Sequence, residues 1–393
     1  MIKADVVVVG LGAFGAATLY QLARAGVSAV GIDRFAPPHD QGSSHGDTRI
    51  TRAGVGEGEA YVPFALRSHE IWRELEGETG EQLYLDCGFL VIDGAENAQF
   101  HGKSGIGKCS VRAARNAGIP HSVLTPAEAM RAFPRFRLRG HELVYFEPGG
   151  GLVFPERCIA AQLSAARRLG ARAILNETVA SVTPVAGGVE VTTASGLTIA
   201  AERAVIAAGG WAPAMVGAPL APMRLLRQTL HWFEPEDWRL YAPENCPTFI
   251  WTHGAEPEAS FYGFPAIAGM ERRGVKIATE QYTRAIERPE AMERDVAPPE
   301  TAELFAEHIA GRMAGLKPNA LHAAACVYTM APDGDFVIDH HPDSERITVV
   351  SACSGHGFKH SAGAGEFITR LTLGEIAGAI GEFRLARPAF VSG

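Results

Sequence analysis

The chain has 393 residues, of which 47% are hydrophobic and 20% charged, a composition typical of a folded globular protein that excludes a disordered one. This length exceeds what one small core accommodates, so two domains are expected. The formal net charge is −8 and the arginines are scattered, which argues against a nucleic-acid-binding surface. No apolar run is long enough to span a bilayer.

The six cysteines lie far apart and form neither a C-x-x-C pair nor a metal-ligand spacing. Such a pattern is typical of buried free thiols in a reducing compartment. We therefore expect a cytoplasmic protein with no metal site and no membrane partner. Both a monomer and a small homo-oligomer remain open.

The first 33 residues predict a dinucleotide-binding unit. Four consecutive valines are typical of a central strand in a parallel sheet. Gly10, Gly12 and Gly15 follow in G-x-G-x-x-G spacing, before a helix with one apolar face. These glycines permit a tight turn, the approach of a pyrophosphate to the helix N-terminus, and close helix packing. A second strand, residues 28–33, ends in Asp33, whose carboxylate can accept a hydrogen bond from a ribose hydroxyl.

The rest of the chain alternates between helical and strand patterns. Residues 34–52 fit neither period, and a long irregular segment of this kind commonly binds a ligand, although its arginines could also be solvated charges. Alternation with glycine turns over 171–208 predicts a meander that ends in a second glycine turn at 209–211. The other patterns predict helices at 60–75, from 126, at 155–169 and near 301–314, and strands at 88–92, near 248–251, 260–263 and 274–278, and at 336–339 and 347–352.

These elements indicate an α/β (α+β) protein, with a Rossmann-like dinucleotide-binding domain and a second domain built on an antiparallel sheet. Changes in composition divide the chain between the two domains in alternation. We assign residues 1–86, 147–213 and 322–393 to the dinucleotide-binding domain, and residues 87–146 and 214–321 to the substrate domain.

Several motifs match one known family. They are G-x-G-x-x-G at 10–15, Gly-Asp-Thr-Arg at 46–49 with Arg52 and Gly-Glu-Gly at 56–58, Tyr-Gly-Phe-Pro at 262–265, Cys-Val-Tyr-Thr at 326–329, Pro-Asp at 332–333 with Phe-Val-Ile-Asp at 336–339, and Ser-Gly-His-Gly-Phe-Lys at 354–359. Through them the chain resembles, nearly end to end, the monomeric sarcosine oxidase and N-methyltryptophan oxidase family of flavoprotein amine oxidases. The resemblance implies an FAD-dependent oxidase that converts a secondary or N-methylated amino acid to an imine, while O2 is reduced to hydrogen peroxide.

The resemblance also implies how FAD is held. In the family, the flavin 8-methyl group is attached to the cysteine that matches Cys326, and Arg49 matches a residue against the flavin. Taken alone, Cys326 predicts an inert buried thiol before a strand, but the neighbouring Tyr328 block favours the covalent link. The residues expected to contact FAD are Gly10, Gly12, Gly15, Asp33, Arg34, Ser44, Thr48, Arg49, Gly209, Trp211, Cys326, Gly355, His356, Gly357 and Lys359.

The resemblance assigns the substrate pocket to residues from distant segments. Arg52 and Lys359 match the pair that binds the substrate carboxylate, a role that suits a planar fork and a point charge. Taken singly, each could equally be a surface charge. Tyr262, Tyr328 and His356 match residues that line the pocket, although a neutral histidine at a helix start could also serve in packing.

Two matches lie after the Tyr-Gly-Phe-Pro block. Lys276, reached after three inserted residues, matches a lysine that activates oxygen, because a fixed cation stabilises negative charge developing on O2. The alternative is a solvated strand lysine. Four residues later the family has a histidine, where this chain has Glu280. Glu280 would favour a substrate with an added donor or positive charge if it faces the pocket, and is otherwise an exposed strand carboxylate.

Other functions remain open at this point. A dehydrogenase on the same fold would pass electrons to a carrier other than O2, and an NAD(P)-dependent reductase would need only the N-terminal motif. An RNA-modifying flavoprotein domain is disfavoured by the acidic charge balance. The expected partners are thus a small amino-acid substrate and O2, and the sequence does not identify the amine.

Overall fold

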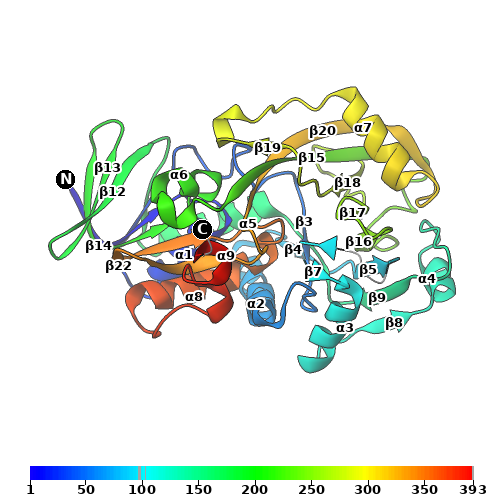
Figure 1. Ribbon diagram of the computed structural model, residues 1–393, viewed down its shortest axis with the longest axis horizontal. Coiled ribbons are helices and arrows are strands. Elements are labelled where there is room, and N and C mark those ends of the chain that lie inside the picture. Colours follow the sequence, from blue (N-terminus) through cyan, green and yellow to red (C-terminus); the bar gives the residue numbers. More distant parts are fainter. Residues whose placement is uncertain (96–98, 102, 392–393) are drawn as a thin grey trace.

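The computed structural model describes residues 1–95, 99–101 and 103–391. Figure 1 shows two lobes side by side, with β12, β13 and α8 at one end and α3, α4 and β8 at the other. One lobe is built on an eight-stranded sheet and the other on a nine-stranded sheet. The ends of strands from both sheets therefore meet in the middle of the molecule.

The eight-stranded sheet confirms the expected dinucleotide-binding architecture. Its central strand, β1, pairs in parallel with β2 and β14, and Val6–Val9 are buried. The sheet order is β11 (Arg172–Ile174), β2 (Ala29–Ile32), β1 (Ile2–Val9), β14 (Thr198–Ile206), β13 (Gly188–Thr193) and β12 (Val179–Val185), with β22 (Ser344–Ser351) on β14 and β21 (Val337–His341) on β22. Helix α1 (Ala13–Arg24) packs with α5 (Pro155–Arg168) and α8 (Ser361–Leu373), and α2 (Val62–Thr79) packs on α8.

Two glycines of the triplet are required by close backbone approach. Gly10 has φ +88°, and a Cβ there would lie 2.5 Å from the carbonyl oxygen of Ala207 at the end of β14. A Cβ on Gly15 would lie 1.7 Å from the carbonyl oxygen of Gly10. The turn and the helix packing predicted from the spacing are therefore both present.

The second lobe has the expected antiparallel sheet, in which only β16 and β5 pair in parallel. Its buried aromatic core includes Phe136, Phe233, Phe249, Trp251 and Phe261. The sheet order is β19 (Ala285–Ile286), β15 (Arg224–Pro235), β18 (Val275–Thr279), β17 (Ser260–Gly263), β16 (Thr248–Thr252), β5 (Phe89–Asp93), β9 (Leu143–Glu147) and β8 (Ser122–Leu124), with β20 (Leu316–Met330) on β15.

Smaller elements connect the lobes and cover the sheets. A three-stranded sheet contains β3 (Arg49–Thr51), β10 (Gly151–Val153) and β4 (Tyr84–Leu85), and β6 (Gln99–Phe100) pairs with β7 (Lys103–Ser104). The remaining α-helices of the described residues are α3 (Ile106–Asn116), α4 (Pro126–Ala132), α6 (Ala212–Val216), α7 (Pro298–Leu304) and α9 (Pro388–Val391). Over the described residues, none of the helices has both the length and the apolarity needed to cross a membrane.

The structure corrects the sequence prediction for residues 316–330. We expected the chain to return to the dinucleotide-binding domain at residue 322 and placed Cys326 before a strand. Instead, β20 continues to Met330 and pairs with β15 throughout, so Cys326 lies within this strand and the predicted boundary falls inside it. The exposed first half of β20 lacks the apolar alternation that marks a strand, which explains the error.

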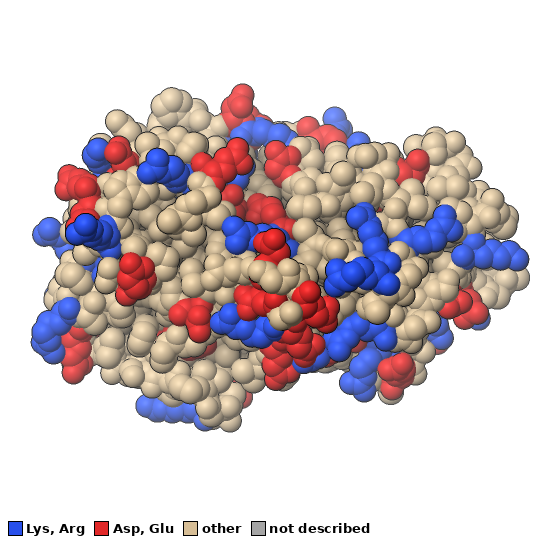
Figure 2. Space-filling model, turned by 180° about the vertical axis from the view of Figure 1, so that it is seen from behind, with Lys and Arg blue, Asp and Glu red and all other residues tan. Residues whose placement is uncertain are grey.

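The helix expected near 301–314 is also different. Helix α7 begins earlier, at Pro298, where proline is well suited to the first helical turn. It continues as a π-helical turn over Phe305–Ile309 and ends at Ala310, whose ψ of 126° is no longer helical. Figure 2 shows acidic and basic side chains interspersed over the face of the molecule opposite to that in Figure 1.

Gly15→Ala is expected to destabilise the protein, lowering the melting temperature by about 3 °C or more, because neither backbone can move away from the added methyl group. Calorimetry or circular dichroism measures the change. Gly77→Ala is the control, since Gly77 is exposed on α2 with no atom near its missing Cβ. It should leave the melting temperature unchanged or raise it, as alanine favours a helix. An unchanged melting temperature for Gly15→Ala would contradict the packing argument.

Candidate active site

A cavity of about 410 Å³ lies between the two sheets and is lined from both lobes. At one end it is bounded by the glycine turn after β1, and at the other by β17 of the nine-stranded sheet and the segment before α8. Of the residues predicted from sequence, it is lined by Gly10, Gly12, Asp33, Arg34, Ser44, Arg49, Arg52, Gly209, Trp211, Tyr262, Glu280, Tyr328, Gly355, His356, Gly357 and Lys359. Gly15, Thr48, Lys276 and Cys326 are not among the lining residues.

The glycine-turn end of the cavity is already fixed by backbone contacts. Asp33 is buried, and its two carboxylate oxygens accept hydrogen bonds from the backbone N–H groups of Leu11 (2.7 Å) and Phe35 (2.8 Å). Helix α1 has no side-chain cap at Gly12. Gly12, Ala13 and Phe14 line the cavity, and the N–H of Ala13 makes only a long hydrogen bond, 3.4 Å, to Ser44 Oγ. This positive dipole end of the helix therefore suits a pyrophosphate.

An element of the second lobe also reaches this end of the cavity. Glu290, which follows β19, pairs with Arg34 and accepts a hydrogen bond from Trp211 Nε1 at 2.7 Å. Arg34 and Trp211 both line the cavity.

The residues present fit a flavin dinucleotide. Among the buried side-chain atoms of cavity-lining residues, Thr329 Oγ1, Ser351 Oγ and His356 Nδ1 have no hydrogen-bond partner. Buried polar atoms normally have hydrogen-bond partners, so these atoms are suited to a polar ligand. Together with the open glycine turn, they support a ligand that extends along the cavity rather than a nucleotide confined to one end.

Arg49 and Cys326 lie close together beside the middle of the cavity. Arg49 donates from its two terminal nitrogens to the carbonyl oxygens of Thr48 (2.8 Å) and Ser43 (2.6 Å). Cys326 is buried against Tyr328 and Cys353. Burial raises the pKa of the Cys326 thiol to about 11, although the Arg49 guanidinium favours the thiolate. The thiol is therefore protonated at neutral pH in this environment.

Lys276 is buried on β18 and is not the solvated strand lysine that was one of the alternatives. Its ammonium group donates to the carbonyl oxygens of Gly46 (2.7 Å) and Thr48 (2.6 Å) and lies 4.0 Å from the centre of the Phe264 ring. Burial, with the nearby Arg49 charge, lowers the pKa of Lys276 well below its ordinary value. The Gly46–Thr48 loop thus fixes a buried amine behind the cavity wall.

Arg52 and Lys359 meet at one buried carboxylate, Glu57, and neither is a surface charge. Arg52 Nη2 lies 2.6 Å from Glu57 Oε2, and Lys359 Nζ lies 3.1 Å from Glu57 Oε1. Burial alone would raise the pKa of Glu57, but the two cations hold it well below its ordinary value. Burial lowers the pKa of Lys359 to about 8, opposed by Glu57.

Both cations keep hydrogen-bond donors that the protein does not use. Arg52 Nε is buried with no partner, and Arg52 stacks at 4.7 Å on Phe89, which fixes the plane of the guanidinium. Lys359 donates to Glu57 and to the carbonyl oxygen of His356, leaving one N–H of its ammonium group. Arg52 and Lys359 both line the cavity, and a guanidinium and an ammonium group with unused N–H donors suit an anionic ligand.

Glu147 is a positioning residue that the sequence analysis missed. It lies at the end of β9, and its two oxygens accept from the backbone N–H groups of Ala53 (2.7 Å) and Gly54 (2.9 Å). Tyr145 also donates to it at 2.6 Å. These bonds fix the chain immediately after Arg52. A carboxylate at a strand end carries no sequence signal for this role.

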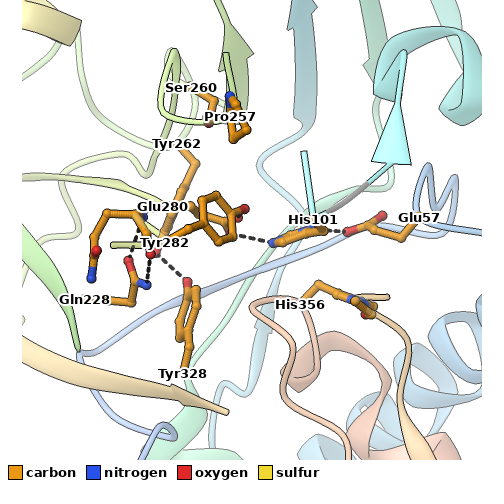
Figure 3. Close-up of polar contacts among 12 residues, drawn as sticks. Glu57, His101, Gln228, Pro257, Ser260, Tyr262, Glu280, Tyr282, Tyr328 and His356 are labelled. Atoms are coloured by element: carbon orange, nitrogen blue, oxygen red, sulfur yellow. Dashed lines mark hydrogen bonds and ion pairs between the residues drawn. The ribbon is translucent and has the colours of Figure 1, made fainter. Parts of the chain in front are cut away.

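His101 was also missed, and it connects two buried carboxylates. Figure 3 shows its imidazole between Glu57 and Glu280. His101 Nε2 pairs with Glu280 Oε1, and His101 Nδ1 lies 3.3 Å from Glu57 Oε1. Burial alone would lower the pKa of His101, but the two carboxylates raise it, and their positions beside both ring nitrogens favour the cationic form. Glu280 is 2% exposed, which rules out the alternative of an exposed strand carboxylate.

The predicted aromatic and histidine residues complete this end of the cavity. The hydroxyl groups of Tyr262 and Tyr328 lie 3.2 Å apart (Figure 3). His356 lies in a turn before a short 3₁₀ helix, Phe358–His360, rather than at the start of α8. Its Nε2 lies 3.0 Å from the carbonyl oxygen of Gly334, and burial, with the Lys359 charge, lowers its pKa well below the ordinary value. His356 is therefore a neutral donor to Gly334.

Glu147→Gln is expected to lower both the melting temperature and the affinity of the cavity for a small carboxylate anion, the latter about tenfold, because charge-assisted bonds that place Arg52 are weakened. Glu142→Gln is the matched control. Glu142 accepts from the backbone N–H groups of Arg139, Gly140 and His141, away from the cavity. It should lower stability without changing carboxylate affinity. Equal affinities in the two variants would contradict the positioning role of Glu147.

Comparison with known proteins identifies relatives of similar length. The FAD dependent oxidoreductase family matches residues 5–371. Monomeric sarcosine oxidase from Streptomyces avermitilis is 35% identical over 382 residues, covering 96% of both chains. N-methyl-L-tryptophan oxidase from Salmonella agona is 32% identical over 388 residues, covering 98% of this chain and 99% of the relative.

Solved structures share the fold at lower sequence identity. NikD, described as an unusual amino acid oxidase essential for nikkomycin biosynthesis, superimposes in its open form with a TM-score of 0.80 at 20% identity, covering 97% of this chain and 99% of NikD. Glycine oxidase from Geobacillus kaustophilus gives a TM-score of 0.72 at 21% identity, covering 98% and 99% of the two chains. The resemblance found in the sequence motifs is thus confirmed, and the chain belongs to the FAD-dependent oxidoreductase family.

Proposed function

We propose that the protein is an FAD-dependent oxidase of a secondary or N-methylated amino acid, with O2 as electron acceptor and hydrogen peroxide as product. The observation that carries this proposal is the pair of free cationic donors on Arg52 and Lys359 in a cavity that begins at the dinucleotide-binding turn. A bound amino acid whose carboxylate accepts from both would be fixed at one end. The sarcosine and N-methyltryptophan oxidase relatives support this substrate class.

The protein's own residues hold and orient the substrate in this proposal. FAD, when bound, supplies the two-electron acceptor for the C–H bond beside the amine and transfers the electrons to O2. Arg52 and Lys359 bind the carboxylate, and Tyr262, Tyr328 and the neutral His356 form walls around the amine. Arg49, which lines the cavity, would contact FAD. The imine leaves the site and hydrolyses to an amine and an aldehyde.

A peroxide-coupled screen over N-methyl, cyclic and aromatic amino acids tests the proposal, together with an oxygen electrode. Oxygen uptake matched by peroxide supports an oxidase, whereas turnover only with an artificial dye would identify a dehydrogenase. Arg52→Ala is expected to raise KM at least tenfold while retaining bound FAD, because the carboxylate loses its planar donor. An unchanged KM would contradict the carboxylate-binding role.

The family resemblance and the position of Cys326 beside Arg49 support covalent attachment of FAD through this thiol. In acid-denatured protein, the yellow colour is expected to stay with the chain, and Cys326→Ser is expected to release it. Cys353→Ser is the matched control, since Cys353 lines the cavity beside Cys326 but lies outside the family motif. Release of the colour from the unmodified protein, or its retention in Cys326→Ser, would contradict the link.

Lys276 is proposed as the cation that promotes reaction with O2. Burial and the Arg49 charge disfavour its cationic form, but the carbonyl oxygens of Gly46 and Thr48 accept hydrogen bonds from its ammonium group and the nearby Asp47 charge also favours the cation, which supports the role. Lys276→Met is expected to slow reoxidation by O2 at least tenfold and to change reduction by substrate much less, because negative charge develops only in the oxygen step. Stopped-flow measurement of each half-reaction separates the two.

Lys317→Met serves as the control for Lys276, because Lys317 is an exposed lysine of β20. It should leave both rates unchanged. Equal slowing of the two half-reactions by Lys276→Met would rule out the oxygen-specific role.

The six free cysteines support the further proposal that the enzyme works in a reducing compartment such as the cytoplasm.

A further inference from the structure

The carboxylate of Glu280, which directly follows β18, retains acceptor capacity. Its Oε1 pairs with His101 Nε2, and its Oε2 accepts from the Tyr282 hydroxyl at 2.7 Å. An ionised carboxylate has about four acceptor positions, so two hydrogen bonds leave it able to accept more. Glu280 also lines the cavity, whose wall at this end includes Phe100 and Tyr262.

The imidazole of His101 separates Glu280 from the carboxylate-binding pair. Glu57, on the other side of His101, takes the bonds of Arg52 and Lys359 (Figure 3). A substrate whose own carboxylate is held by Arg52 and Lys359 therefore meets Glu280 with a different part of the molecule. That part is the side chain or the nitrogen substituent.

The charges of the buried cluster limit which kind of substrate group can bind beside Glu280. The buried cluster has three cationic groups, Arg52, His101 and Lys359, and two anionic ones, Glu57 and Glu280. The substrate carboxylate is the third anion and makes the cluster neutral when the substrate amine is in its unprotonated form. An added ammonium group would leave an unbalanced positive charge, and a second carboxylate an unbalanced negative one, and unbalanced buried charge is costly. A neutral N–H or O–H donor leaves the balance intact.

We propose that Glu280 is a specificity-determining residue that accepts a hydrogen bond from a neutral N–H or O–H group on the substrate's side chain or nitrogen substituent. His101 and Tyr282 act as positioning residues, since they hold both carboxylate oxygens. The inference rests on the proposed function, because it takes the substrate carboxylate to be bound by Arg52 and Lys359. Among N-substituted amino acids, Glu280 therefore favours those that carry such a donor.

Binding of inert acids to the FAD-loaded enzyme tests the proposal without turnover. Two pairs of probes have similar size, and only one member of each pair carries an N–H donor: malonamate against isovalerate, and indole-3-acetate against 1-benzothiophene-3-acetate. Calorimetric titration gives the ratio of affinities within each pair. In at least one pair, the ratio in favour of the donor acid is expected to be about tenfold greater in the unmodified enzyme than in Glu280→Gln, because a bond to a charged acceptor is stronger than one to an amide.

Glu287→Gln is the matched control, since Glu287 is an exposed glutamate on the same lobe. It should keep the ratios of the unmodified enzyme. Glu280→Asp is a second variant, in which the charge remains but the acceptor is withdrawn by one methylene, and it should also lower the ratio. FAD content and melting temperature are measured for each variant, so that a folding defect in one leaves the other informative.

The outcomes separate this inference from the proposed function. Equal affinities within both pairs for the unmodified enzyme, or ratios that Glu280→Gln and Glu280→Asp leave unchanged, would overturn the role of Glu280. If none of the four acids binds and no N-methyl amino acid is oxidised, the carboxylate site itself is overturned. Oxidation assays compare N-methyl-serine, which carries a hydroxyl donor, with N-methyl-2-aminobutyrate, which does not. The ratio of their kcat/KM values should likewise fall in Glu280→Gln and Glu280→Asp.

Discussion

The candidate site depends on one buried carboxylate, Glu57, which lies between Arg52 and Lys359 and faces His101. Each of these cations is almost fully buried, and burying a charge without a partner is strongly unfavourable. Glu57 offsets part of this cost while leaving unused donors on both Arg52 and Lys359. The protein can therefore maintain an anion-binding site inside a cavity before any ligand arrives.

The two lobes contribute to this arrangement in different ways. The eight-stranded sheet places the glycine turn and, through the segment before α8, Lys359. The nine-stranded sheet supplies Glu280 after β18, Tyr328 from β20 and, through β9, the Glu147 carboxylate that fixes the backbone after Arg52. The cavity belongs to neither sheet alone, so its geometry depends on how the two sheets pack together.

Local sequence patterns predicted the elements whose conformation depends on residues close to one another in the chain. The G-x-G-x-x-G spacing predicted β1, the turn and α1, because Gly10 and Gly15 are required by backbone contacts within that unit. The motifs identified Arg52 and Lys359 only through the family resemblance, since no periodicity relates residues so far apart in the chain. The course of β20 was misjudged because its first half is solvent-exposed and so lacks strand alternation.

Three residues of the site were beyond what the sequence could assign. Glu147 and His101 act through contacts with distant segments, and a single carboxylate or histidine carries no pattern that indicates its partner. Glu280 was recognised as a departure from the family, but its burial depends on His101 and Tyr282, which fold against it from other positions. Long-range pairing of buried charges is therefore the information that the sequence lacked.

The amine of Lys359 also has a thermodynamic consequence for the whole protein. Its pKa is about 8 when folded against an ordinary value of 10.5, so between these values the unfolded chain binds more protons than the native one. This difference amounts to about 3 kcal/mol of native-state free energy that is lost below pH 8 and regained as the pH rises towards 10.5. The same rise in pH removes the positive charge that would hold an acid. A high pH, at which Lys359 is neutral, thus favours the fold, whereas a lower pH, at which Lys359 is protonated, favours binding of an acid.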